Sequence, residues 1–359
     1  MPEAACTMHE RKRDALSHDA AVLAENFRWA CMLDVAVRKP GNVSLHSPGH
    51  GMQAAQFLAS AQAAAPLLCA PDLRVGQRIE QSVIATQAAA GCNTNLGILL
   101  LCAPIAAAMW RVPTGTATDA VERAAAATGN CAAQGRPMGA PCPTAVSLRA
   151  ALKHVLHDLD RDDAAAAFRA IAMANPGGLG NSDEQDVRTA PTVSLRAAME
   201  IAAARDRIAL QYVTDFDDLF APALPDFMAG LGKPLSAASL STSVQALFLG
   251  FLTRFPDAHI VRKHGPSLAQ SVTQQARQWR NAWGHAAANM HDAAHREQAL
   301  AQWDARLKAA SINPGTSADL TVATLFLAAC LNPHLRELSP DGEVAWKMHF
   351  RYSAQFPAA

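Results

Sequence analysis

Apolar residues recur along most of the chain at the three-to-four-residue spacing of an amphipathic helix. The stretch 19–37 shows the pattern well, with Val22, Leu23, Phe27 and Ala30 on one face. No stretch alternates at period two for long, and no strand–helix–strand order appears. We therefore predict an all-α fold. The predicted helices cover residues 19–37, 52–68, 76–90, a run from Leu96, 119–127, 147–158, 162–174, 195–212, 236–255, 267–283, 292–310 and 321–330.

The domain organisation that we predict is simple. Residues 1–17 are polar and are expected to form a flexible N-terminal segment, and residues 18–359 are expected to form one all-helical domain. Residues 112–145 are rich in Ala, Gly, Pro and Thr, and we interpret them as a connection within this domain.

Five polar loops that contain Gly, Pro or Asn interrupt the apolar helices. They cover residues 38–51, 91–97, 175–187, 256–265 and 313–319. Loops of this kind can gather at one end of a helical bundle. We expect a single-domain multi-helix bundle whose active-site loops surround a central cleft.

The fifth loop is the best-defined turn. Pro314 biases Asn313 away from the helical region, and Gly315 tolerates unusual dihedral angles. Thr316 or Ser317 could then cap the following helix, whose unpaired N–H groups favour a phosphate or carboxylate. Asp319 is expected at the rim of such a pocket, where it could bind a metal ion. The alternative is an ordinary capped helix with a solvated Asp.

Composition narrows the function classes. Thirty-one basic and thirty-one acidic residues cancel, which argues against nonspecific binding to nucleic acid or to a membrane surface. The apolar run 96–109 is too short to span a bilayer, the first thirty residues are charged, and the eight cysteines include no C-x-x-C pair. We expect a cytoplasmic protein with buried, reduced cysteines.

The loops carry complementary chemistry. Lysine and arginine neutralise phosphates, carboxylates bind Mg²⁺, and glycine turns let backbone N–H groups approach a ligand. Together they favour a nucleotide-triphosphate site with Mg²⁺. The cations are Lys39, Arg262 and Lys263, the carboxylates Asp183, Glu184, Asp186, Asp257 and Asp319, and the neutral groups Asn42, Asn93, Thr94, Asn95 and Ser317. Neither a P-loop nor a strand-linked G-x-G-x-x-G motif is present.

Two other groups have open interpretations. His46 and His50 lie four residues apart, and His259 and His264 share another loop, so the alternatives are a transition-metal site or histidines that contact substrate. Arg205-Asp206-Arg207 falls inside the predicted helix 195–212, where it is either an ion-paired surface or part of the site.

The five loops in this order resemble the triphosphoribosyl-dephospho-CoA synthase family over about residues 20–332. The most specific pieces are Lys39-Pro40-Gly41, Asn93-Thr94 with Gly97, and Pro314-Gly315 with Ser317-Ala318-Asp319-Leu320. The resemblance implies an all-α transferase that moves the triphosphoribosyl group of ATP to dephospho-CoA with release of adenine. ATP is then a substrate and Mg²⁺ a cofactor, and a homodimer is compatible with the resemblance.

The resemblance also implies roles for residues. Asp257, Asp319 and Glu184 are predicted to be catalytic, and Asp257, Asp319 and Asp183 to bind the metal. The predicted nucleotide contacts are Lys39, Gly41, Asn42, His46, His50, Asn93, Thr94, Asn95, Gly178, His259, Arg262, Lys263, Asn313, Gly315 and Ser317.

The chain departs from the family pattern in three loops. Gly51-Met52-Gln53 lacks the family's two acids, Asn95 and Leu96 stand where the family has His and Lys, and residues 175–186 lack its Arg. These changes indicate a divergent branch, similar to homologues in bacteria that handle formaldehyde with tetrahydromethanopterin. One alternative is therefore an enzyme of one-carbon cofactor (tetrahydromethanopterin or methylofuran) biosynthesis acting on a phosphorylated or nucleotide-like substrate. Another is a non-catalytic helical protein that binds an anionic ligand.

Overall fold

The computed structural model describes residues 2–112, 142–176, 184–232, 237–285 and 290–338, and these residues form helices joined by loops. No strand occurs among them, only two isolated β-bridges in the loop 44–52. The predicted all-α class is confirmed. The helices are α1 (Pro2–Ala36), α2 (Ala54–Leu68), α3 (Val75–Ala90), α4 (Leu96–Met109), α6 (Ala145–His157), α7 (Arg161–Ala174), α8 (Leu195–Ala202), α9 (Arg207–Val213), η2 (a π-helix, Leu219–Ala223), α10 (Leu224–Gly230), α11 (Ala237–Arg254), α12 (Ala258–His264), α13 (Pro266–His285), α14 (Met290–Ala309), α15 (Gly315–Leu331) and η3 (a 3₁₀-helix, Pro333–Glu337).

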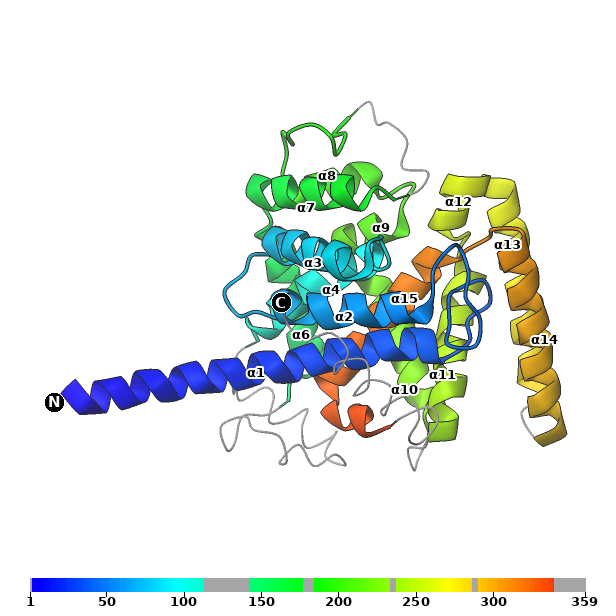
Figure 1. Cartoon of the computed structure of the whole chain (residues 1–359), viewed down its shortest axis with the longest axis horizontal. Coiled ribbons are helices and arrows are strands. Elements are labelled where there is room, and N and C mark those ends of the chain that lie inside the picture. Colours follow the sequence, from blue (N-terminus) through cyan, green and yellow to red (C-terminus); the bar gives the residue numbers. More distant parts are fainter. Residues whose placement is uncertain (1, 113–141, 177–183, 233–236, 286–289, 339–359) are drawn as a thin grey trace.

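Helix α15 is the central element of the fold. It packs against α1, α4, α9, α10, α11 and α12, and Figure 1 shows it running through the middle of the molecule. Nearly all of its residues are buried, and the same is true of α4. Helices that are apolar all round can only be stable in the interior, which is where both lie.

Helix α4 contains Pro104, and a neighbouring helix compensates for it. Proline has no N–H, so the carbonyl of Leu100 loses its helical partner. The hydroxyl of Tyr212, on α9, donates to this carbonyl at 2.6 Å. This bond ties α9 to α4 and lets α4 continue to Met109.

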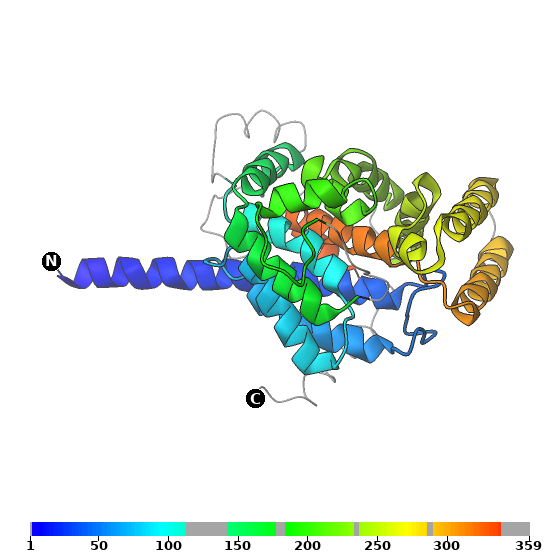
Figure 2. The same cartoon turned by 90° about the horizontal axis from the view of Figure 1, so that it is seen from above.

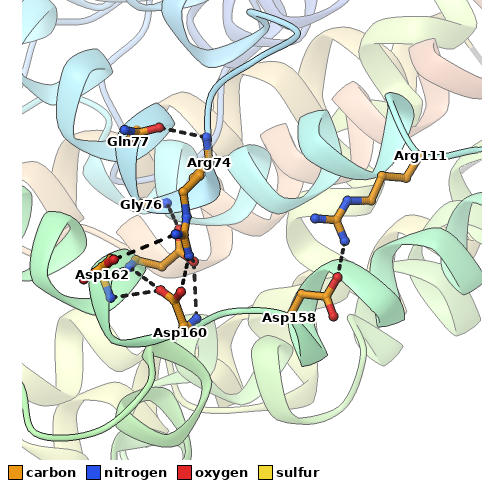
Figure 3. A network of polar contacts seen from close by, with 8 residues as sticks. Arg74, Gly76, Gln77, Arg111, Asp158, Asp160 and Asp162 are labelled. Atoms are coloured by element: carbon orange, nitrogen blue, oxygen red, sulfur yellow. Dashed lines mark hydrogen bonds and ion pairs between the residues drawn. The ribbon is translucent and has the colours of Figure 1, made fainter.

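A polar network fixes α7 against α3. Figure 3 shows Arg74, just before α3, beside Asp160 and Asp162 at the start of α7. Asp163 accepts from Arg74 at 2.9 Å and from the N–H of Gly76 at 2.9 Å. A Cβ atom at Gly76 would lie 2.6 Å from the backbone of Asp163, so glycine permits this close approach. The network sets the position of α7 and of α8, which follows it.

A second apolar cluster lies at the side of the molecule formed by α11, α12, α13 and α14. Its centre is Trp303, stacked on Trp279 with ring centroids 5.8 Å apart. In Figures 1 and 2, α14 lies at the outer edge of this side, and the first part of α1 extends from the opposite side.

Several boundaries differ from those predicted. The helix predicted at 195–212 is two helices, because Asp206 accepts from the N–H groups of Ile208 and Ala209 and starts α9. The loop predicted at 256–265 contains α12, which Asp257 caps in the same way. Helix α15 begins at Gly315 without a side-chain cap, so the predicted capping by Thr316 or Ser317 is wrong.

Other predictions concern the chain ends and the cysteines. Helix α1 begins at Pro2 and so covers residues 1–17 almost completely, while the flexibility expected there stays a prediction. The helix predicted at 119–127 lies outside the described residues. Among the described residues, Cys31, Cys69, Cys102 and Cys330 are buried and form no disulfide, whereas Cys92 and Cys142 are half-buried. No described helix is long and apolar enough to cross a membrane.

Candidate functional site

A cavity of about 690 Å³ is lined by residues from all five predicted loops. A cavity of this size matches the range that binds nucleotide-sized ligands. The predicted site residues on its wall are Asn42, His50, Asn93, Thr94, Asn95, Glu184, His259, Arg262, Lys263, Asn313, Gly315 and Asp319.

The first and fifth loops interlock at one edge of the cavity. Gly41 has φ of +87°, and a Cβ atom there would lie 2.6 Å from the ring of Pro314, so both its conformation and its contact require glycine. The side-chain N–H of Asn42 donates to the side-chain oxygen of Asn313 at 2.6 Å. The ring Nε2 of His50 lies 2.7 Å from the carbonyl oxygen of Gly41. Three cavity residues are thereby held in one arrangement.

The second loop forms the start of α4. Asn93 accepts from the N–H of Leu96 at 3.1 Å, and Thr94 donates to Ser60 at 2.6 Å. Asn95 accepts from Thr86 at 3.1 Å. These contacts turn the first turn of α4 toward the cavity, and a helix start favours negative charge.

Gly97 and Asp319 bring the first turns of α4 and α15 together. A Cβ atom at Gly97 would lie 2.0 Å from a carboxylate oxygen of Asp319, so the carboxylate rests directly on the Gly97 backbone. Burial raises the pKa of Asp319 well above its ordinary value, and the carboxylates of Asp34, Asp257 and Asp206 raise it further. Asp319 is thus a cavity carboxyl group with an increased affinity for a proton, as a general base or acid requires.

Basic groups gather on another part of the wall, at α12 and the first loop. Burial, with Arg262 and Lys263 close by, lowers the pKa of His259 to about 3. Burial and Lys263 also lower the pKa of His50. Both imidazoles are therefore neutral near pH 7, and the fixed positive charge comes from Arg262 and Lys263. Together these groups suit an anionic ligand.

A third part of the wall is apolar and comes mainly from α7 and α8. The third loop and the start of α9 also contribute to this part. Its side chains are Met52, Phe57, Phe168, Ile171, Val187, Leu195, Met199, Ile201 and Ile208. One cavity therefore combines a basic part, a carboxyl group at two helix starts and an apolar part.

Five predicted site residues in the described part of the chain do not line the cavity, namely Lys39, Gly41, His46, Asp257 and Ser317. Lys39 is fully buried, with its ammonium 2.9 Å from a carboxylate oxygen of Asp34 and donating to the Asp34 carbonyl. The predicted phosphate contact of Lys39 is therefore not what the geometry shows. Burying an ammonium group requires a paired carboxylate, and Asp34 supplies it.

Asp257 and Ser317 are also buried in the interior, where they bind each other. Asp257 is fully buried and accepts from the N–H groups of His259 and Ile260, and from the N–H and hydroxyl of Ser317 at 2.7 and 2.8 Å. Burial raises the pKa of Asp257, although these donors act in the opposite direction. Its oxygens are occupied, so the geometry gives it a structural place and no metal or substrate contact.

Four further residues were predicted to belong to the site. His46 is exposed and Gly41 is buried, and neither lines the cavity. Gly178 and Asp183 lie outside the described residues. Within the described part of the chain, no group of three or more His, Cys, Asp or Glu side chains could hold a metal ion.

The sequence interpretation missed Asp34 and the apolar wall, and it left Arg205-Asp206-Arg207 open between an ion-paired surface and a part of the site. Asp34 lies in the last turns of α1, where nothing in the spacing marks it as functional. Asp206 lines the cavity as the cap of α9, 3.8 Å from Arg262. The signal for Asp206 was present, because an Asp before an apolar run is a helix start.

Comparison with known proteins adds the family. A family model described as ATP:dephospho-CoA triphosphoribosyl transferase matches residues 20–337. The chain belongs to this family. The match covers most of the chain and every described residue that lines the cavity, so the resemblance noted in the five loops is confirmed at the level of the family. The family is one of transferases that use ATP.

A solved structure shares the fold. A crystal structure from Archaeoglobus fulgidus, whose name assigns it to triphosphoribosyl-dephospho-CoA synthase, superposes with a TM-score of 0.51 at 20% identity. The similarity covers 76% of this chain and 98% of the other. Among curated proteins, no relative matches the chain.

Proposed function

We propose that this transferase moves the triphosphoribosyl group of ATP to dephospho-CoA, releases adenine, and does so in the cavity described above. The observation that carries the proposal is the division of this one cavity into three chemical parts. The basic part at α12 suits the triphosphate, Asp319 suits proton transfer, and the apolar part at α7 and α8 suits a flat, uncharged ring.

The reaction is a displacement at C1′ of the ATP ribose. A hydroxyl oxygen of the acceptor forms a bond to C1′, the bond from C1′ to the adenine nitrogen breaks, and its electron pair leaves with adenine. The hydroxyl proton passes to a carboxylate, and water donates a proton to the adenine nitrogen as adenine leaves. The carboxylate then returns its proton to water, so the proton count is unchanged. Asp319 is our candidate for the carboxylate, because it lines the cavity with a raised pKa. Glu184 also lines the cavity and remains a second candidate.

The charged side chains on the cavity wall are relevant to Mg²⁺ binding. The described lining residues include five carboxylates (Asp34, Glu184, Asp186, Asp206, Asp319) and three cations (Arg205, Arg262, Lys263). A triphosphate adds further negative charge, so a divalent cation bound to the triphosphate would offset the excess. Mg²⁺ needs only one or two protein carboxylates when phosphates supply other ligands, and Asp319 fits that use. Bound Mg²⁺ would supply charge neutralisation.

The proposal is tested by incubating the full chain with ATP, Mg²⁺ and dephospho-CoA and measuring free adenine. Asp319→Asn is expected to lower kcat by about 100-fold or more, since a positioned proton-transfer group contributes about that much. Asp226→Asn is the matched control, because Asp226 is an exposed carboxylate paired with Arg254. No adenine release by the wild-type protein despite ATP binding would contradict the proposal.

The Asp319→Asn variant is also expected to change how the stability of the folded chain depends on pH. The folded-state pKa of Asp319 is raised, so ionisation of Asp319 costs stability as pH rises through that pKa. Asp319→Asn removes this cost and is expected to be more stable than wild type at pH 8, with a smaller gain at pH 5. Denaturant unfolding at both pH values measures it. A variant that is less stable at pH 8 would contradict the placement of Asp319.

The charges missing from the second loop favour a second candidate function. With Asn95 and Leu96 where the family has His and Lys, the cavity could take a different phosphorylated or nucleotide-like substrate in one-carbon cofactor biosynthesis. A deletion strain that still makes its complete set of one-carbon cofactors would exclude this candidate. If Asp319→Ala restored such a strain fully, a binding role without catalysis would be favoured.

A further inference from the structure

The first loop is held from behind by α14, through a carboxylate that lies outside the cavity. Asp304 is 1% exposed, and its Oδ1 accepts from the N–H of Gly41 at 2.8 Å. Its Oδ2 lies 2.9 Å from the ammonium of Lys308 and 3.4 Å from the guanidinium of Arg38. Asp304 is not among the residues that line the cavity.

Gly41 transmits this contact to the cavity wall. Its carbonyl oxygen is bound by His50, and its Cα packs on Pro314, next to Asn313. Its neighbour Asn42 binds Asn313. A shift of the Gly41 peptide would therefore move His50, Asn42 and Asn313, which all line the cavity.

Lys308 extends the same attachment further along the loop. Its ammonium donates to the carbonyl of Ser47 at 3.1 Å, and its stem lies against Gly49, where a Cβ atom would be 3.0 Å from Cε. The ammonium is only partly exposed, and Asp304 is the carboxylate that pairs with it. Asp304 thus acts on the loop directly at Gly41 and through Lys308 at Ser47.

We propose that Asp304 is a positioning residue, which holds the first loop so that Asn42, His50 and Asn313 meet the ligand in one fixed arrangement. The proposal deepens the proposed function, since the ligand contacts that it positions are those of that site. It differs from a general stabilising role because its effects are local to the loop and the ligand.

The electrostatics of His50 give an independent readout. Burial lowers the pKa of this ring, as do Lys263 and Lys308, whereas the bond to the Gly41 carbonyl and the charge of Asp304 raise it. Removing the charge of Asp304 is expected to lower the pKa of His50 further. Loss of the bond from His50 to the Gly41 carbonyl would shift the pKa in the same direction, so the titration reports on the contact of Asp304 with Gly41 as well as on its charge.

The test compares Asp304→Asn with Glu297→Gln in the full chain. Glu297 lies on the same helix and binds the same Arg38, at 2.7 Å, but it is half exposed and contacts the first loop only through this side-chain pair. For Asp304→Asn we expect hydrogen exchange of residues 41–50 and 313–315 to become about tenfold faster. We also expect the His50 pKa to fall in an NMR titration, and KM for ATP to rise about tenfold with kcat changed less than about threefold. Glu297→Gln is expected to match wild type in all three.

Lys308→Met is the second variant, for the case that Asp304→Asn does not fold. It keeps the bond from Asp304 to Gly41 and removes the bond to Ser47 together with the ion pair between Lys308 and Asp304. Exchange is therefore expected to quicken at 46–50 and not at 41–42. The inference is overturned if exchange of the first loop is unchanged in both variants, or if exchange quickens equally in all helices. Absence of adenine release by wild type would contradict the proposed function alone, because the exchange and titration experiments need no turnover.

Discussion

Gly97 shows how one missing side chain determines the geometry of the cavity. Its backbone supports the Asp319 carboxylate, and a Cβ atom there would lie 2.0 Å from that carboxylate. Gly97→Ala is expected to displace Asp319 and lower kcat/KM by about 100-fold, the order expected for a shift of about 1 Å at a reacting group. Overpacking is expected to cost about 1–3 kcal/mol in the free energy of unfolding. Adenine release and denaturant unfolding measure the two effects.

The matched control for Gly97 is another helical glycine. A Cβ atom at Gly250, on α11, would meet nothing within 4 Å. Gly250→Ala is expected to leave activity unchanged and to add up to about 1 kcal/mol of stability. Equal activity of Gly97→Ala and Gly250→Ala would show that the Asp319 carboxylate does not depend on this contact.

Charged residues show where sequence interpretation succeeds and where it stops. Arg262, Lys263 and Asp319 line the cavity as the loops predicted. Lys39 and Asp257 are also a lysine and an aspartate in polar loops, but neither lines the cavity. Lys39 pairs with Asp34, and Asp257 caps α12. Whether such a residue lines the cavity depends on which partner its side chain contacts after folding. These partners are distant in the chain or lie within a helix that reads as apolar, so the sequence does not reveal them.

At the scale of elements, Asp257 joins the start of α12 to the start of α15. Asp257→Ala removes acceptors from four buried donors, so we expect a loss of roughly 2–4 kcal/mol in the free energy of unfolding. Ser317→Ala removes one of those donors and is expected to cost only about 1 kcal/mol. Chemical denaturation of both variants measures the difference. Similar losses would mean that the cap of α12 contributes little.

Helix boundaries were predicted well where apolar spacing is regular and poorly where a cap falls within it. Most predicted helices have structural counterparts within a few residues. Asp206 and Asp257 both start short helices, in one case inside a predicted helix and in the other inside a predicted loop. Asp is a common capping residue, so both positions could have marked a helix start. A prediction from the spacing of apolar residues does not take a single Asp into account.

At the scale of the whole molecule, ligand binding should stabilise the folded chain because the cavity exists only when its distant segments are together. ATP at about 100 times its Kd is expected to add about 2.7 kcal/mol, a rise in Tm of roughly 3–6 °C. Thermal unfolding with and without ATP measures the shift, and Asp226→Asn should show the same rise. Adenine alone producing the full rise would contradict a triphosphate contact.

The sequence predicted that five loops would supply the site, and the cavity contains residues from each of them. It did not predict that α7 and α8 close the cavity with apolar side chains. Phe168 and Met199 follow ordinary helical spacing, and their face is chosen by the network around Arg74 that sets α7 against α3. Such long-range packing has no local signature.

The central position of α15 also has a consequence for synthesis of the chain. Every other segment that contributes to the cavity precedes α15 in the sequence, and α4 is apolar on all sides. During translation, the surfaces of α1 and α4 that pack on α15 therefore stay uncovered until α15 has left the ribosome. Partly folded chains with exposed apolar surface tend to aggregate. The apolar helices that surround the cavity in the folded protein are therefore the part of the nascent chain that stays exposed longest.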